Sequence, residues 1–336
     1  MSVPGLLLNS NGFTTGVQGT QGKAFPQFPG APCAPVVNAV RRWGAALTLC
    51  LALSAPAGAQ PRLLRASDND TLPAKPPTAR IHYGPDSLQF GDLRLPSTPG
   101  PYPVVIVIHG GCWVSRFATI QNSTAIADAL RDAGFATWNI EYRRTDSPGG
   151  GWPNTFLDVA RATDHLRMLA KQYRLDLTRT IALGHSAGGH LALWLAGADR
   201  VPAASEIARR DPLKLRGAIA LAGIADLADF RTYSANSCGS VVDPLMGGSP
   251  DEVPERYAAG SPVALFPLSV PQMQIVGTLD RVIPQRAREA HEAAARASGS
   301  VFELIVIDGA GHHEPMSPRS AAWPAIERAV RGLIRP

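Results

Sequence analysis

A serine lies between two glycines in the segment Gly184-His185-Ser186-Ala187-Gly188, where its hydroxyl could act as a nucleophile. The segment follows a predicted strand and precedes a predicted helix, which is the context in which a G-x-S-x-G motif carries a catalytic serine. Glycines on both sides fit a sharp turn with a strained residue at its tip. The alternative is a glycine-rich turn whose serine only caps the following helix.

A serine hydroxyl becomes a nucleophile when a histidine takes its proton and an acidic group orients that histidine. Asp280 follows the strand predicted at 273–276, and His312 follows the strand predicted at 301–307. Both therefore lie where parallel strands end and sites form. We predict that they serve Ser186, because His312 directly follows a Gly-Ala-Gly turn that projects it from its loop.

Three other residues compete for these two roles. His313 is the alternative base, and Asp226 and Asp308 are alternative acids. Asp226 is the stronger rival because it also follows a predicted strand. The ordinary role of such loop residues is to cap a turn or to face solvent.

A serine nucleophile also needs N–H donors for the negative charge that develops on the substrate oxygen. The segment His109-Gly110-Gly111-Cys112-Trp113 follows the buried strand predicted at 104–108, where such a loop belongs. We predict that the donors are the backbone amides of Gly111, Cys112 and Ala187. The alternative is an ordinary Gly-Gly turn after a strand.

Aromatic residues and a histidine near these motifs are candidates for the substrate pocket. We predict that it is lined by Trp113, His185, Phe230 and Tyr233, and that further apolar contacts come from Leu245, Met246 and Phe266. The alternative is that the aromatic residues form a small core of their own. We expect His109 and His190 to be structural.

The apolar pattern alternates between strands and helices along the chain. It predicts strands at 87–95, 104–108, 135–142, 180–183, 217–221, 273–276 and 301–307, and helices at 119–133, 156–173, 189–196, 285–297 and 321–334. Alternating strands and helices indicate an α/β fold with a mostly parallel sheet covered on both faces. Residues 226–271 lack this alternation, and we interpret them as a small insertion after strand 6, here the strand predicted at 217–221. The insertion is too short for a large lipase lid.

Residues 81–336 resemble the α/β-hydrolase superfamily, and within it the serine esterases of the hormone-sensitive-lipase-like, kynurenine-formamidase-like and feruloyl or acetyl esterase branch. The resemblance lies in the segments 109–113, 141–143 and 184–190, together with Asp280 and His312. It implies an α/β-hydrolase fold and the chain order serine, acid, histidine. Cys112 stands where the formamidases commonly have an aromatic residue. The substrate is therefore open, although the backbone amide at this position is unaffected.

The first 80 residues differ in composition from the rest. Residues 36–59 combine two arginines, an apolar run at 43–54 and a final Ala-Gly-Ala, which predicts a Sec-type signal peptide cleaved after Ala59. The apolar run is too short for a membrane anchor. Residues 1–35 are a doubtful extension, and the Pro-rich residues 60–80 are predicted to be a linker.

Composition excludes some classes of partner. The chain is 45% hydrophobic and 18% charged, as expected for a protein with an ordinary core. Its net charge of +5 falls to about +2 without residues 1–59, which contain three basic and no acidic residues. We therefore expect no nucleic-acid partner and no stable membrane insertion. No metal-ligand spacing is found, so we expect no cofactor or metal. We expect Cys112 and Cys238 to be free thiols.

These observations predict an exported hydrolase, periplasmic or secreted, that cleaves short-acyl or aryl carboxylic esters through an acyl-enzyme on Ser186. Its partner would be a small ester substrate. Two alternatives stay open at this point: an arylformamidase, and a binding protein with a hydrolase fold and no activity.

Overall fold

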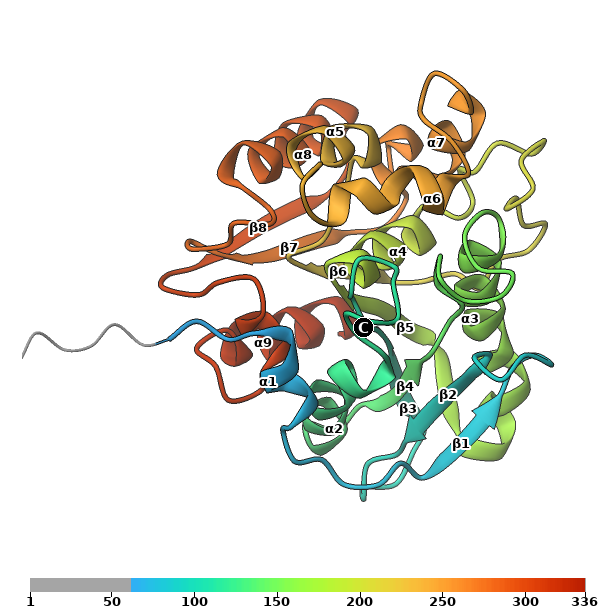
Figure 1. The fold of residues 1–336 in the computed structure, drawn as a ribbon. Coiled ribbons are helices and arrows are strands. Elements are labelled where there is room, and N and C mark those ends of the chain that lie inside the picture. The colour runs from blue at the N-terminus through green and yellow to red at the C-terminus, as the bar shows by residue number, and fades with distance from the viewer. Residues whose placement is uncertain (1–61, 336) are drawn as a thin grey trace, which may run out of the picture. The chain divides into compact units, whose positions relative to one another are not determined.

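A computed structural model describes residues 62–335, which contain an eight-stranded sheet with the strand order β1-β2-β4-β3-β5-β6-β7-β8 (Figure 1). Strand β2 pairs antiparallel with β1 and with β4, and every other neighbouring pair is parallel. The strands are β1 (Ala79–His82), β2 (Phe90–Arg94), β3 (Tyr102–Ile108), β4 (Ala136–Ile140), β5 (Leu175–His185), β6 (Gly217–Leu221), β7 (Gln272–Gly277) and β8 (Phe302–Ile307).

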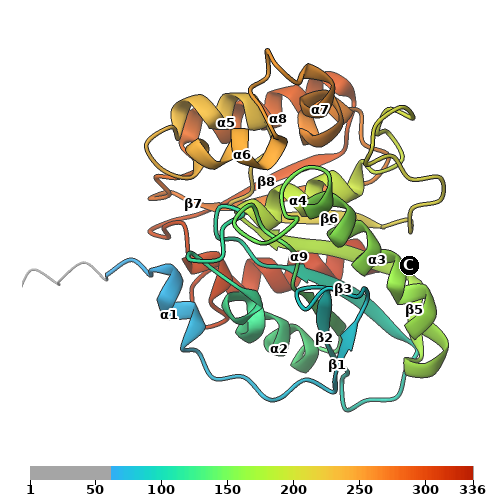
Figure 2. The same ribbon diagram turned by 45° about the vertical axis from the view of Figure 1, so that its right-hand side comes forward.

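Helices cover both faces of this sheet (Figure 1 and Figure 2). The described α-helices are α1 (Ala66–Asp70), α2 (Thr124–Asp132), α3 (Asn154–Tyr173), α4 (Ala187–Ala196), α5 (Leu227–Tyr233), α6 (Val242–Met246), α7 (Pro254–Gly260), α8 (Gln285–Ser298) and α9 (Trp323–Ile334). Four short 3-10 helices accompany them: η1 (Ile120–Ser123), η2 (Cys238–Val241), η3 (Pro262–Leu265) and η4 (Glu314–Met316). None of the helices within residues 62–335 is long and apolar enough to cross a membrane.

The core is divided into two layers by the sheet, because successive side chains of a strand point to opposite faces. In β3, Val105 and Val107 pack with α2 and α9, whereas Val104, Ile106 and Ile108 belong to the larger cluster with α3 and α4. The fully buried β-branched residues of β3 explain why the sequence shows a continuous apolar run there.

The predicted α/β class and the insertion after the sixth strand are confirmed. Helices α5, α6 and α7 lie between β6 and β7, and the helices of the regular alternation lie where the sequence indicated. Strand β5 is longer than predicted, since it begins at Leu175 rather than near residue 180.

The segment expected to be a linker is part of the folded domain over its described residues. Helix α1 and the start of β1 lie within residues 62–80, and Asn69 is buried. These short elements could not be predicted from the polar, Pro-rich composition of the segment, because residues from distant parts of the chain stabilise them. The side chain of Asn122, for example, donates hydrogen bonds to the carbonyl oxygen of Ala66 and to the carboxylate of Asp70. The predicted signal peptide and N-terminal extension lie outside the described residues.

Candidate active site

Ser186 occupies the sharp turn between β5 and α4, with φ of 52° and ψ of −116°. This left-handed region disfavours a residue with a side chain, so the turn holds the serine in a strained conformation. The flanking glycines are required by close backbone contacts, because a Cβ atom on Gly184 would overlap the carbonyl oxygen of Gly188 and one on Gly188 would overlap that of Ile108. The Ser186 hydroxyl makes no hydrogen bond that caps α4, so the capping alternative does not describe this serine.

Asp280 and His312 form a hydrogen-bonded pair beside this turn. His312 Nδ1 lies 2.9 Å from Asp280 Oδ2, and the other carboxylate oxygen accepts backbone N–H bonds from Val282 and Ile283. Burial alone would raise the pKa of Asp280, but the charge and hydrogen bond of His312 and these two N–H groups outweigh burial and hold the pKa below its ordinary value. Asp280 is therefore an ionised group that can orient His312.

The rival residues have other partners. The carboxylate of Asp226 accepts the backbone N–H groups of Ala228 and Asp229 and so caps α5. Asp308 is exposed and accepts a hydrogen bond from the hydroxyl of Thr278. His313 makes no hydrogen bond to a carboxylate within the described part of the chain. The structure thus brings Asp280 to His312 and none of the rivals.

The loop after β3 has an unusual backbone. Gly111, Cys112 and Trp113 have φ values of 95°, 53° and 54°, so three successive residues adopt left-handed conformations. Among the hydrogen bonds of residues 62–335, none is donated by the amides of Gly111, Cys112 or Ala187. These amides are the ones that the sequence suggested as donors to a substrate oxygen, and none of them is engaged elsewhere.

The buried carboxylate of Glu141 fixes His109, which lies at the start of this loop. Glu141 lies 2.8 Å from His109 Nε2 and accepts a hydrogen bond from the Arg144 guanidinium, while the Tyr142 hydroxyl donates to the His109 carbonyl oxygen. Burial opposes ionisation of Glu141, but His109, Arg144 and a backbone N–H outweigh it and lower the pKa to about 2. Glu141 lies in the segment 141–143 that contributes to the family resemblance, but the sequence predicted no role for it. The available signal was an acidic residue at the end of a strand buried on both faces.

Comparison with protein families matches residues 92–293 to the family model described as BD-FAE. The chain belongs to the BD-FAE family. The match spans more than half of the chain and includes Ser186, Asp280 and the loop after β3, whereas His312 lies beyond its end.

Curated relatives of this BD-FAE protein include Esterase LipC of Mycobacterium tuberculosis, which is 29% identical over 69% of this chain and 59% of its own length. Esterase LipQ of the same organism is 26% identical over 77% of this chain and 64% of its own length. The chain thus spans about three fifths of the length of these two relatives.

Solved structures with a similar fold include a truncated carbohydrate esterase from gut microbiota, with a TM-score of 0.63 and 21% identity over 76% of this chain and 94% of that one. Esterase B from Lactobacillus rhamnosis has a TM-score of 0.66 and 17% identity over 80% of this chain and 91% of its own. These likenesses, together with the family, confirm the predicted α/β-hydrolase fold.

The pocket of the BD-FAE domain at Ser186 has a volume of about 240 Å³. Its walls are mostly apolar and come from the loop after β3 with η1, the turn at Ser186, the loops that carry Asp280 and His312, the start of η2, and α1. The residues are Ala66, Gly111, Cys112, Phe117, Ala118, Asn122, His185, Ser186, Ser237, Cys238, Val282, His312 and His313. His185 lines it as predicted, and His185 Nε2 is hydrogen bonded to the His312 carbonyl oxygen at 2.8 Å.

The other predicted pocket residues lie elsewhere. Trp113 is fully buried and packs edge-on against His190 and Phe230, so Trp113 and Phe230 belong to the core, as the alternative interpretation had it. Leu245 and Met246 are also buried core residues, and Phe266 does not line this pocket.

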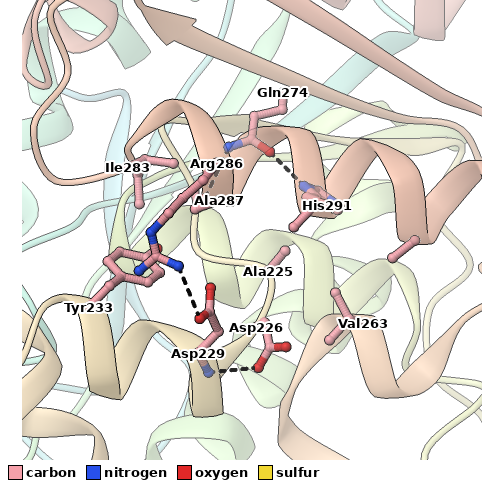
Figure 3. Close-up of a pocket in the computed structure, with 13 residues that line it drawn as sticks. Ala225, Asp226, Asp229, Tyr233, Val263, Gln274, Ile283, Arg286, Ala287 and His291 are labelled. Carbon is pink, nitrogen blue, oxygen red and sulfur yellow. Dashed lines mark hydrogen bonds and ion pairs between the residues drawn. The ribbon is translucent and has the colours of Figure 1, made fainter. Parts of the chain in front are cut away.

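Tyr233 lines a different pocket, of about 330 Å³, beside α5 and α8 (Figure 3). There it lies under the guanidinium of Arg286, which also pairs with Asp229. Asp226 faces the same pocket. The prediction that Tyr233 contacts the substrate at Ser186 is therefore wrong, because the insertion folds its aromatic residues inward or toward α8.

The expectation of free thiols is also wrong, because Cys112 and Cys238 form a disulfide. The two Cα atoms are 5.1 Å apart, although 126 positions separate the residues in sequence. The bond connects the β3 loop to η2 in the insertion. Both cysteines line the pocket at Ser186.

Replacing Glu141 by glutamine is expected to destabilise the domain in a pH-dependent manner. Because the folded-state pKa lies below the ordinary 4.5, the ionised carboxylate stabilises the fold above about pH 4.5, and this contribution is lost as the pH falls toward 2. We expect Glu141→Gln to lower the melting temperature by roughly 5 °C at pH 7 and by progressively less below pH 4. Thermal unfolding followed by circular dichroism from pH 7 to pH 3 measures both differences.

The matched control is Glu327→Gln, which removes a carboxylate from an exposed ion pair with Arg331 and should change the melting temperature little at any pH. An equal loss of stability for Glu141→Gln at pH 7 and pH 3 would contradict the assignment of an ionised buried anchor.

Proposed function

We propose that this protein is a serine carboxylesterase that forms an acyl-enzyme on Ser186. The observation that carries the proposal is the strained Ser186 in one pocket with His312, which is hydrogen bonded to a buried, ionised Asp280. The same pocket contains Gly111 and Cys112, whose amides donate no hydrogen bond within residues 62–335. The names of the relatives LipC and LipQ, both esterases, support the same class of reaction.

In the first step the Ser186 oxygen attacks the ester carbonyl carbon while His312 Nε2 takes the hydroxyl proton. The negative oxygen of the tetrahedral intermediate accepts hydrogen bonds from the amides of Gly111, Cys112 and Ala187. The intermediate then expels the alcohol, which leaves with the proton from His312. A water molecule, deprotonated by the same histidine, cleaves the acyl-enzyme and releases the acid.

Asp280 stabilises the positive charge that His312 carries during each step. Its own pKa is held below the ordinary value, so it stays ionised when His312 takes the proton. The bond from His312 Nδ1 to Asp280 leaves Nε2 as the nitrogen available to the serine and the leaving group.

We expect substitutions at Ser186 and Asp280 to lower the rate of ester hydrolysis strongly, and a similar substitution at Asp226 to leave it almost unchanged. Ser186→Ala should reduce cleavage of p-nitrophenyl acetate to background, and Asp280→Asn should lower kcat by about 100-fold or more. Asp226→Asn is the control, since asparagine also caps a helix and should leave kcat within about twofold. Steady-state kinetics with the folded variants measures the effects.

Covalent labelling adds an independent measurement. An organophosphate should modify Ser186 of the wild-type protein, and the fraction of modified protein should equal the fraction of activity lost. Peptide mapping identifies the modified residue. Activity that resists the reagent, or that survives in Ser186→Ala, would defeat the proposed mechanism.

The pocket supports a short acyl group or a compact aryl ester as substrate. About 240 Å³ is at the small end of ligand pockets, and most of the lining atoms are apolar. We expect rates on p-nitrophenyl esters to be highest for two to four acyl carbons and to fall by about tenfold or more for long chains. A dodecanoyl ester cleaved as fast as the acetate would contradict a small pocket, with Ser186→Ala supplying the background rate.

We also propose that the protein is exported, as the N-terminal sequence predicts. The Cys112–Cys238 disulfide supports this location, since disulfides form and persist in oxidising compartments. The exported protein is expected to begin at Gln60. N-terminal sequencing of protein recovered from the periplasm or medium tests this, and retention of an uncleaved chain in the cytoplasm would contradict it.

A further inference from the structure

The loop that would bind the substrate oxygen needs to be held in place. Gly111 has no Cβ atom and therefore adopts its positive φ at low cost. Cys112 and Trp113 do have a Cβ atom, and their φ values are nevertheless 53° and 54°. Residues with a Cβ atom disfavour this conformation and keep it only where surrounding contacts enforce it. Cys112, which lines the pocket, thus has a backbone conformation that would relax if it were released.

Two sets of contacts hold the ends of this loop. Before it, His109 is fixed by Glu141 and by the Tyr142 hydroxyl. After it, Trp113 is fully buried, and its carbonyl oxygen accepts hydrogen bonds from the amide and hydroxyl of Thr145 at 2.9 and 3.0 Å. Neither set acts on the Cys112 peptide itself.

The turn at Cys112 is closed by one backbone hydrogen bond, from the Val114 amide to the Gly111 carbonyl oxygen at 2.9 Å, and the side chain of Cys112 is held by its disulfide with Cys238. Around the bond, Cys112, Val114 and Val241 form a small apolar cluster separate from the two main cores. So few apolar contacts stabilise the position of Cys112 weakly without the covalent bond. Cys238 begins η2 in the insertion, so the disulfide joins the loop after β3 to a second element that lines the pocket.

We propose that the Cys112–Cys238 disulfide is a positioning device for catalysis, with Cys238 as the positioning residue that fixes the Cys112 amide toward the substrate oxygen. The inference rests on the proposed esterase function. It follows that esterase activity depends on the oxidation state of this bond. Dithiothreitol would break the S–S bond and convert it to two thiols, while its own two thiols lose two electrons and two protons and close into a cyclic disulfide.

The test compares kcat and KM of the full chain in the oxidised and reduced forms with those of Cys238→Ser. We expect Cys238→Ser to lower kcat by about tenfold or more with KM within about threefold, because a misplaced amide affects the transition state more than substrate binding. Dithiothreitol should lower wild-type kcat by a similar factor, and reoxidation should restore it. The reagent should not affect Cys238→Ser, because this variant cannot form the Cys112–Cys238 bond.

A matched variant is Asn236→Ala, an exposed residue two positions before Cys238 that does not line the pocket, and it should keep wild-type kcat and KM. Circular dichroism checks that reduced protein and Cys238→Ser stay folded. If Cys238→Ser does not fold, the reversible loss of kcat in reduced, folded wild type carries the test. Peptide mapping without reductant should recover residues 112 and 238 in one linked peptide.

The outcomes separate this inference from the proposed function. Wild type that hydrolyses esters with equal kcat before and after reduction, or that is active with both cysteines as free thiols, overturns the positioning role and leaves the esterase proposal standing. Wild type that hydrolyses no ester overturns both. A loss of activity that appears only as a raised KM would assign the disulfide to the pocket wall rather than to the oxyanion donor, and also overturns the inference.

Discussion

The site depends on how closely the start of α4 approaches the ends of β3 and β5. At Gly184 and Gly188 this approach leaves no room for a Cβ atom, since the backbone oxygens of Gly188 and Ile108 occupy the space. The tight contact turns the chain within one residue and forces Ser186 into a positive φ. It also brings the start of α4 next to Ser186, where the Ala187 amide donates no hydrogen bond within residues 62–335. A wider turn would give neither the strained Ser186 nor the helix end beside it.

The parallel register of the sheet then brings the remaining groups to the same place. Ile108 pairs with Gly184, so the loop after β3 begins level with the serine turn. His185 pairs with Leu221, which in turn pairs with Ile275, so β7 ends near the same line and Asp280 follows it by a few residues. Side chains from four loops meet because parallel strands end together, which is the reason that such sheets carry sites at this edge.

Two buried carboxylates in this region are paired with histidines but serve different purposes. Glu141 and His109 are both shielded from solvent, and His109, Arg144 and a backbone N–H keep Glu141 ionised, so this pair fixes a backbone. Within residues 62–335 Asp280 makes no ion pair with a lysine or arginine, and backbone N–H groups and His312 stabilise it. The first pair therefore holds the loop after β3, whereas the histidine of the second lines the pocket at Ser186.

The sequence allowed seven of the eight strands, the serine turn and the acid and histidine loops to be predicted, because each depends on a short run of contiguous residues. Strand β1, which pairs only with β2 at the sheet edge, was not predicted. The lining of the pocket could not be predicted in this way. Whether Trp113 and Phe230 face substrate or core depends on how the insertion packs over α4, and the structure pairs them with each other. The disulfide is equally non-local, since Cys112 and Cys238 meet only after the insertion has folded back across the site.

The N-terminal segment at 62–70 also depends on contacts with distant parts of the chain, and these contacts lie close to the site. The side chain of Glu314 accepts hydrogen bonds from the amides of Leu64 and Gly311, so it joins this segment to the loop that carries His312. Ala66, in the same segment, lines the pocket. A chain that begins at Gln60, as the sequence predicts, retains Leu64 and Ala66 and therefore keeps both the contact with the histidine loop and this part of the pocket wall.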